Sequence, residues 1–165
     1  MGRGLVLSYE CVGLPSRIYY YLAKTYLRMQ DFDKALEFGE KENKQNPLKS
    51  DGNSVLGEIY TFMEEWEKAI KHFEKAISLN TKDQDALLNL GFIRKEQRQF
   101  EQAKELLVRA KSVNDKNPQV YRVLADIYRG MNQNDLAIEQ YEAYLKMNPT
   151  ASDKGEVEAT IKSLR

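Results

Sequence analysis

The chain has 165 residues, with 25 lysines and arginines against 25 aspartates and glutamates, so its formal charge is zero. That length can bury the core of one domain, and the balanced charge excludes a general attraction to nucleic acid or to an anionic membrane surface. No apolar run approaches the ~18 residues of a membrane span, and the single cysteine, Cys11, excludes an intrachain disulfide. We therefore expect a soluble protein without nucleic-acid binding or membrane insertion. Its cysteine usage fits a reducing compartment and favours the cytoplasm.

Residues 1–15, MGRGLVLSYECVGLP, precede the first regular pattern. Tyr9 and Glu10 soon interrupt the apolar run at residues 5–7, so a signal peptide is not expected. Two interpretations stay open for this segment. It is either the truncated end of a preceding helical unit or an irregular arm that lies on the first unit.

From residue 16 onward, small and apolar residues recur with a period of 34. The clearest columns are Leu22, Leu56, Leu90 and Leu124; Ala23, Gly57, Gly91 and Ala125; and Ala35, Ala69, Ala103 and Ala137. Chance does not align this many columns over four copies, and a fixed period of this length is the signature of a repeat array.

Each copy is predicted to form two helices. In the third copy, residues 85–97 and 101–113 each show helical periodicity, and the short link between them suits antiparallel neighbours. An acid opens the second helix, where it faces the positive end of the helix dipole, and an asparagine closes it. The acids are Asp33, Glu67, Glu101 and Asp135, and the asparagines are Asn46, Asn80, Asn114 and Asn148. We expect these asparagines to adopt the left-handed conformation that helix ends often require.

The small columns have a packing reason, because two helices approach closely only where neither carries bulk. The glycine and alanine columns are expected to let the two helices of a copy nest against each other. A third small column, Ala76 and Ala110, is assigned to contact with the following copy.

This pattern resembles the tetratricopeptide repeat, a helix–turn–helix unit of 34 residues. The second copy carries the signature best, at Leu56, Gly57, Tyr60, Trp66, Ala69, Phe73 and Ala76. The resemblance implies an all-α fold: a right-handed superhelical solenoid of four repeats, with a concave groove lined mainly by the first helices. The expected divisions are an N-terminal arm or truncated repeat at 1–15, repeats at 16–49, 50–83, 84–117 and 118–151, and a C-terminal capping helix at 152–165.

The last segment resembles the extra helix that seals the open end of such arrays. Val157, Ile161 and Leu164 form one apolar stripe, and Asp153 and Glu156 have the spacing of a capping box. Tyr144 replaces the alanine of earlier copies and is expected to pack under this helix.

The sequence offers no pattern for catalysis. His72 is the sole histidine and is expected at the surface, and one histidine with one cysteine cannot make a typical zinc site. No phosphate-binding or dinucleotide-binding glycine motif occurs. We therefore expect no enzyme activity, no metal and no cofactor.

The family's groove positions can be carried over residue by residue. They are Tyr20, Tyr21, Lys24, Val55, Glu58, Phe62, Leu88, Asn89, Phe92, Lys95, Arg122, Asp126 and Arg129. The apolar members among them are expected to form a strip with charged margins, because large rings on a concave surface make good anchors for a partner. The open alternative is that some of them only pack against neighbouring first helices.

The resemblance implies a non-enzymatic scaffold, or adaptor, that binds a peptide or protein segment in its groove. Two alternatives remain: a structural unit that self-associates through its array ends, or the interaction domain of a larger protein. Chaperone-binding members of the family hold a carboxylate with a cationic clamp. The corresponding positions here are Tyr20, Lys24, Val55, Asp85 and Asn89, or one copy later Ser54, Glu58, Asn89, Gln119 and Val123. Neither set assembles such a clamp, so that activity is not expected.

Overall fold

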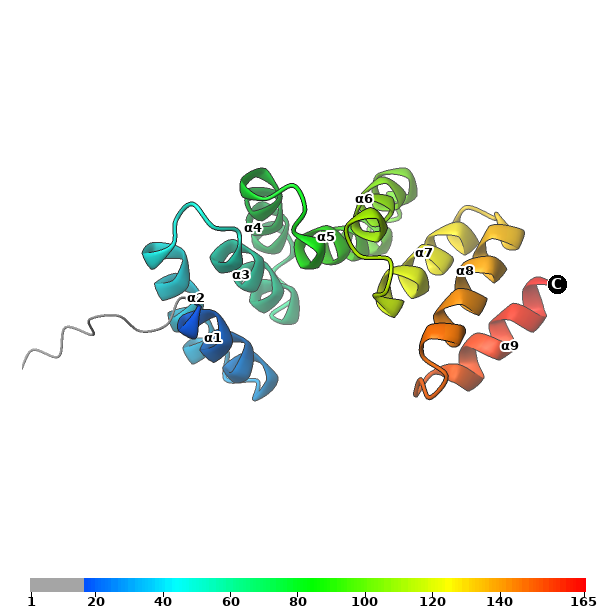
Figure 1. The fold of residues 1–165 in the computed structure, drawn as a ribbon, viewed down its shortest axis with the longest axis horizontal. Coiled ribbons are helices and arrows are strands. Elements are labelled where there is room, and N and C mark those ends of the chain that lie inside the picture. The colour runs from blue at the N-terminus through cyan, green and yellow to red at the C-terminus, as the bar shows by residue number, and fades with distance from the viewer. Residues whose placement is uncertain (1–16) are drawn as a thin grey trace, which may run out of the picture.

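The computed structural model describes residues 17–165, which form nine α-helices and no strand. The helices are α1 (Ile18–Arg28), α2 (Phe32–Gln45), α3 (Asp51–Phe62), α4 (Trp66–Leu79), α5 (Gln84–Glu96), α6 (Phe100–Val113), α7 (Pro118–Gly130), α8 (Asn134–Met147) and α9 (Lys154–Leu164). They follow one another in a single curved row from α1 at one end to α9 at the other (Figure 1). The two interpretations of residues 1–15 lie outside the described residues.

The row is built from helix pairs, in which α1 packs on α2, α3 on α4, α5 on α6 and α7 on α8. Each first helix also contacts the first helix of the next pair, whereas the second helices of the described residues make no contact with one another. The first helices therefore lie on the inner, concave side of the curve (Figure 1). This confirms the expected right-handed superhelical solenoid of four helix–turn–helix repeats followed by a C-terminal helix. The residue boundaries of the repeats stay a prediction.

The small columns are where paired helices meet. A Cβ atom added to Gly57 of α3 would lie 2.6 Å from the ring of Phe73 in α4, and one added to Gly91 of α5 would lie 1.9 Å from Leu107 in α6. Ala110 is fully buried in a cluster that includes residues of the following helix, α7, as expected for a contact between copies. Short side chains thus set the distance between neighbouring helices.

The asparagine column closes the second helices, but the expected conformation was wrong. All four asparagines are helix C-caps with φ between −126° and −150°, which is not left-handed. Besides Arg17, which precedes α1, four left-handed residues stand in the links between the two helices of each copy. They are Gln30, Glu64, Arg98 and Asn132, with φ between 58° and 60°.

These four residues end the first helices in the same way. In the first copy, the N–H of Asp31 donates to the carbonyl of Tyr26 at 3.0 Å, and the same bond recurs in the other three copies. A left-handed residue followed by this bond is the Schellman motif, which satisfies carbonyl groups left free at a helix end. A further column with a 34-residue period therefore exists, and it is defined by backbone conformation rather than by residue type.

The C-terminal helix α9 seals the last repeat. Val157 and Ile161 are buried against Tyr141 and Tyr144 of α8, so the expected position of Tyr144 is confirmed. The capping box is not formed, because Asp153 makes no side-chain bond to its own helix. Its carboxylate is engaged across the array end, in contacts described below.

Candidate protein-interaction surface

A set of ion pairs crosses the concave side from one first helix to the next. Arg17, just before α1, bonds Asp51 of α3 at 3.0 Å. Lys24 of α1 places its Nζ atom 3.0 Å from Oε1 of Glu58 in α3, and 3.7 Å from Oδ2 of Asp85 in α5. One lysine thereby joins three successive repeats.

Burial has opposite consequences for the two partners of the Lys24–Glu58 pair. Burial acts to lower the pKa of Lys24, but Glu58, helped by Tyr20 and Asp85, outweighs this effect and raises that pKa, so the ammonium stays charged. Burial raises the pKa of Glu58, and Lys24 only partly opposes the shift. The short contact favours the ionised pair at neutral pH, with the Glu58 side chain only 14% exposed.

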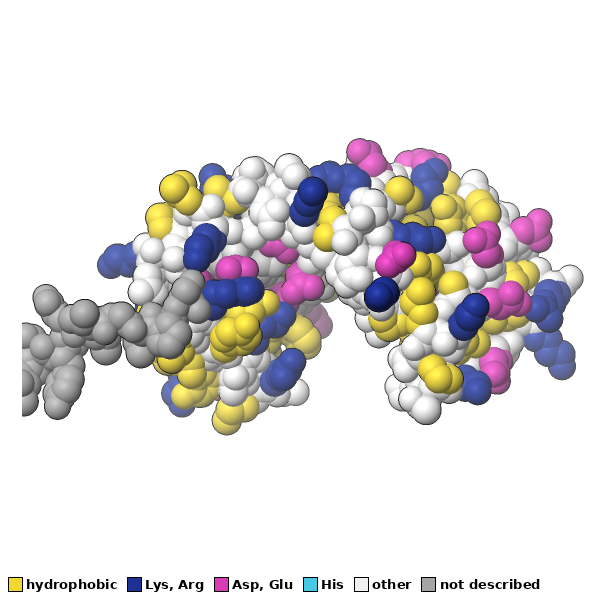
Figure 2. Space-filling view, in the orientation of Figure 1, with side chains coloured by type: hydrophobic (Ala, Val, Ile, Leu, Met, Phe, Trp, Pro, Cys, Tyr) yellow, Lys and Arg dark blue, Asp and Glu magenta, His cyan; other side chains and the backbone are white. Residues whose placement is uncertain are grey.

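A second group of ion pairs occupies the C-terminal part of the concave side. The Asp126 carboxylate of α7 forms three ion pairs. Its partners are Arg122 at 2.6 Å, Arg129 at 3.6 Å and Lys95 of α5 at 3.8 Å. Arg122 also bonds Asp153 at 3.0 Å, which ties α7 to the start of α9. We call the Arg17–Asp51 pair, the Lys24 pairs and this second group together the ion-pair ladder. Figure 2 shows acidic and basic side chains interspersed on a face that is hollowed between the two ends of the array.

The expected apolar members of the groove differ in exposure. Tyr21 and Phe62 are exposed rings, at 60% and 65%. Val55 is fully buried in the core cluster beside α1, and Leu88 and Phe92 are half-buried and pack against the core. Of these members, Tyr21 and Phe62 are the largely exposed rings, and both lie in the N-terminal half.

Of the two remaining groove positions, Tyr20 contacts the ladder and Asn89 bonds the backbone of its own helix. Tyr20 is half-buried and accepts a hydrogen bond from Lys24 at 3.3 Å, and the Arg17 guanidinium lies 4.8 Å from its ring centroid. Burial raises the pKa of Tyr20, so its hydroxyl stays protonated. Asn89 donates to the backbone carbonyl of Asp85 at 3.0 Å.

Two pockets open beside the N-terminal part of the ladder. One, of about 240 Å³, is lined by Phe62 together with Lys24, Leu27, Arg28 and Glu58.

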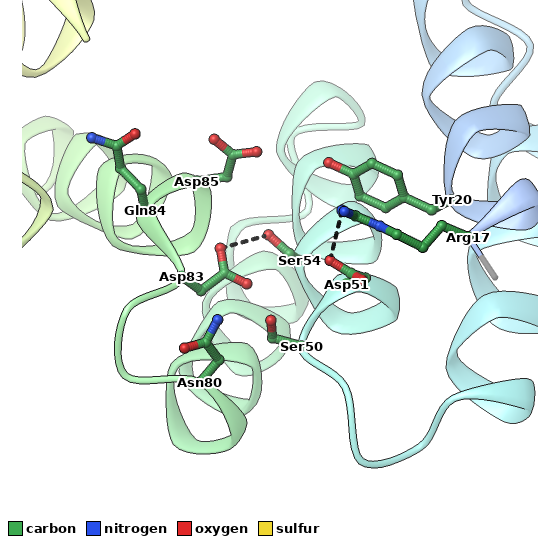
Figure 3. Close-up of a pocket in the computed structure, with 9 residues that line it drawn as sticks. All are labelled: Arg17, Tyr20, Ser50, Asp51, Ser54, Asn80, Asp83, Gln84 and Asp85. Atoms are coloured by element: carbon green, nitrogen blue, oxygen red, sulfur yellow. Dashed lines mark hydrogen bonds and ion pairs between the residues drawn. The ribbon is translucent and has the colours of Figure 1, made fainter. Parts of the chain in front are cut away.

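The other pocket, also about 240 Å³, lies where α3 and α5 begin, and we call it the acidic pocket (Figure 3). Its lining includes Arg17, Asp51, Asp83 and Asp85. Ser54 donates to Asp83 across it at 3.4 Å.

Sequence reasoning did not assign four lining residues of the acidic pocket to the groove: Ser50, Asn80, Asp83 and Gln84. Asp83 is the N-cap of α5 and accepts from the N–H of Ala86 at 3.0 Å. The N-cap preference for aspartate could have identified it. No sequence signal indicates Ser50, because its position in the pocket depends on how α3 and α5 approach each other.

His72 is not the surface residue that we expected. It is half-buried, its Nδ1 lies 3.1 Å from Oδ1 of Asn53, and its ring stacks on Tyr60. Burial lowers its pKa. Among residues 17–165, no three histidine, cysteine or acidic side chains are grouped so that they could hold a metal ion. Within the same range, no helix has the length and apolarity needed to cross a bilayer.

The class of protein follows from this architecture together with family matches. Two tetratricopeptide repeat profiles match the sequence, one over residues 63–127 and the other over residues 16–41 and 118–150. Together they cover more than half of the chain, which therefore belongs to the tetratricopeptide repeat family. No curated protein sequence matches the chain significantly.

Several solved structures share the fold. A thermophilic tetratricopeptide repeat protein of Thermus thermophilus is 24% identical with a TM-score of 0.74, over 91% of this chain and 81% of that one. PilF of Pseudomonas aeruginosa is 22% identical with a TM-score of 0.79, over 88% of this chain and 65% of that one. MamA of Desulfovibrio magneticus is 16% identical with a TM-score of 0.72, over 92% of this chain and 90% of that one. At these identities the likeness establishes the fold alone.

Tetratricopeptide repeats mediate protein–protein interactions, and proteins of this family are generally non-catalytic scaffolds. The chain is thus a protein-interaction scaffold in this general sense.

Proposed function

We propose that the chain is a non-enzymatic scaffold that holds a peptide or protein segment of a partner along its concave side. The observation that carries this proposal is the exposure of Tyr21 and Phe62, two large rings on successive first helices. Neither ring is needed to fill the core, and buried aromatic anchors supply much of the energy of protein interfaces.

The surroundings of Phe62 support a binding role. Its ring lines a pocket together with Lys24 and Glu58, so an apolar contact lies directly beside the ion-pair ladder. The charged groups of the ladder are already held by one another, which reduces the side-chain entropy lost when a partner binds. Such a surface offers one apolar anchor point beside several fixed polar groups.

A peptide-display selection on the intact chain tests this function. Peptides selected on the parent are measured by fluorescence anisotropy against the double variant Tyr21→Ser/Phe62→Ser. Loss of two aromatic anchors should weaken binding by about tenfold or more.

The matched control is Leu48→Ser/Val108→Ser, which removes two exposed apolar side chains outside the first helices. The control should bind as the parent does. Equal binding by the parent and the Tyr21/Phe62 variant would overturn the proposal.

A second candidate function, self-association through an array end, rests on a different observation. Leu22 of α1 is only half-buried, whereas its equivalents Leu56, Leu90 and Leu124 are 2%, 4% and 2% exposed. The difference arises because a second helix precedes α3, α5 and α7, whereas no described helix precedes α1. The described residues therefore leave an apolar face at α1 partly uncovered.

Light scattering over a hundredfold range of concentration tests this candidate. Self-association predicts a mass that rises with concentration, and Leu22→Glu should abolish the rise. A constant monomer mass would rule it out.

A further inference from the structure

The acidic pocket contains more negative charge than its own residues neutralise. Arg17 is committed to Asp51 at 3.0 Å. The half-exposed Asp85 carboxylate shares its cation with Glu58, because Lys24 Nζ lies 3.7 Å from Asp85 Oδ2 and 3.0 Å from Glu58 Oε1. Asp83 uses Oδ1 for Ser54 and for the start of α5, which leaves Oδ2 without a hydrogen-bond partner among the described residues. Three carboxylates therefore line the pocket: Asp51 is paired with Arg17, Asp85 shares one lysine with Glu58, and Asp83 has no ion-pair partner among the described residues.

The hydroxyl of a largely buried serine also opens into the pocket. Ser50 is only 7% exposed, and it precedes α3 without capping it through its side chain. Its Oγ faces the space between Asn80, Asp51 and Asp83 (Figure 3). No residue of the described chain accepts from or donates to this hydroxyl. Because this hydroxyl opens into the pocket and has no protein partner among the described residues, a ligand or solvent can complete its hydrogen bonding there.

The chemistry of these groups selects an organic cation. Helix N-termini attract anions, but Asp51, Asp83 and Asp85 already occupy the starts of α3 and α5. A further anion would face Asp83 and Asp85, whose charges the one arginine of the pocket does not neutralise. The acidic groups are also not close enough together to hold a metal ion. A guanidinium, which is planar and carries five donors, can serve two carboxylates and a hydroxyl at once.

We propose that the acidic pocket receives an arginine side chain of the partner segment. This inference rests on the proposed function, since it names the chemistry of what the concave side binds. The arginine would donate to Asp83 and Asp85 and to Ser50 Oγ, while the adjacent part of the segment lies along α1 and α3 near Tyr21 and Phe62.

The first test uses small probes on the intact chain. N-acetyl-arginine amide and its neutral isostere N-acetyl-citrulline amide are titrated while ¹H–¹⁵N amide shifts are recorded. The arginine probe should produce saturable shifts at residues 50–54 and 83–86, and the citrulline probe should not. Citrulline shifts of equal affinity at these residues, or no saturable arginine shift, would overturn the proposal.

Two matched double variants distinguish the loss of the pocket carboxylates from a general change in net charge. Asp83→Asn/Asp85→Asn removes both carboxylates, and asparagine remains able to cap α5. It should weaken the arginine probe by about tenfold. Asp33→Asn/Asp135→Asn makes the same charge change at exposed positions on second helices and should leave binding unchanged. Unchanged binding by the Asp83/Asp85 variant would contradict the assignment.

The selected peptides then distinguish this inference from the proposed function. Their arginines are replaced by citrulline, and the affinity is expected to fall by about tenfold on the parent but not on Asp83→Asn/Asp85→Asn. If neither change matters while Tyr21→Ser/Phe62→Ser still weakens binding, the arginine assignment fails and the groove function stands. If Tyr21→Ser/Phe62→Ser has no effect, the groove function itself fails.

Discussion

Lys24 and Glu58 are joined by a 3.0 Å ion pair and stand 34 residues apart, so one repeat is bonded to the next through equivalent positions of their first helices. Both side chains are largely shielded from water. The pair therefore bonds neighbouring repeats at the same position of the 34-residue period.

The first prediction concerns the energy of this pair. Lys24→Met leaves the Glu58 carboxylate buried without its cation, and the free energy of unfolding should fall by ~1–3 kcal/mol. The double variant Lys24→Met/Glu58→Gln should recover part of that loss, because no uncompensated charge remains. Urea unfolding of the four proteins in the cycle measures the coupling. Additive effects within ~0.5 kcal/mol would mean that the pair contributes nothing specific.

The second prediction compares two glycines that lie in helices. Gly57→Ala places a Cβ 2.6 Å from the buried Phe73 ring and should cost ~1–3 kcal/mol by overpacking. Gly155→Ala in α9 meets nothing within 4 Å and should stabilise by up to ~1 kcal/mol through helix propensity. Thermal melts of the two variants should therefore shift in opposite directions. Shifts of the same sign would count against the packing role of the small columns.

The third prediction concerns the attachment of α9. The Asp153 carboxylate accepts from the Tyr144 hydroxyl at 2.6 Å and from Arg122 Nε at 3.0 Å. Asp153→Ala removes both bonds and should cost ~1–3 kcal/mol. In Asp153→Ala, amide hydrogen exchange should be accelerated more in α9 than in α3, relative to the parent. Glu158→Ala, on the same helix at an exposed position, serves as the control and should not change the exchange. Uniform exchange changes along the whole chain would contradict a local role.

The fourth prediction is a pH dependence from His72. Burial, followed by the nearby Lys71 charge, lowers the pKa of His72 below its ordinary value of 6.5. As the pH falls, the unfolded chain therefore protonates His72 at a higher pH than the folded chain does. The stability contributed by neutral His72 is fully present above pH ~6.5 and is lost as the pH falls through the folded-state pKa. Chemical unfolding from pH 7.5 to 5 should show a steeper loss for the parent than for His72→Gln. Parallel curves would mean that His72 does not titrate with folding.

The fold could be predicted because the repeat columns report packing directly. A position such as Gly91 must be small in any array of this geometry, so residue type alone reveals it. The left-handed column could not be found in this way. Its members, Gln30, Glu64, Arg98 and Asn132, share a backbone conformation but no side-chain property.

The site could be predicted only in part. Family positions predicted which residues face the concave side, but exposure depends on what packs beside each residue. Val55 and Phe62 are on the same helix, yet one is fully buried and the other is 65% exposed. The ladder depends on side chains from different repeats meeting, as Lys24 and Asp85 do, and such contacts follow from the superhelix rather than from local sequence.

Amide-shift mapping of the parent chain with its tightest selected peptide tests the central claim most directly. The account predicts that the largest changes fall on α1, α3 and α5, around Tyr21, Phe62 and the acidic pocket. Changes confined to the second helices α2, α4, α6 and α8 would contradict it.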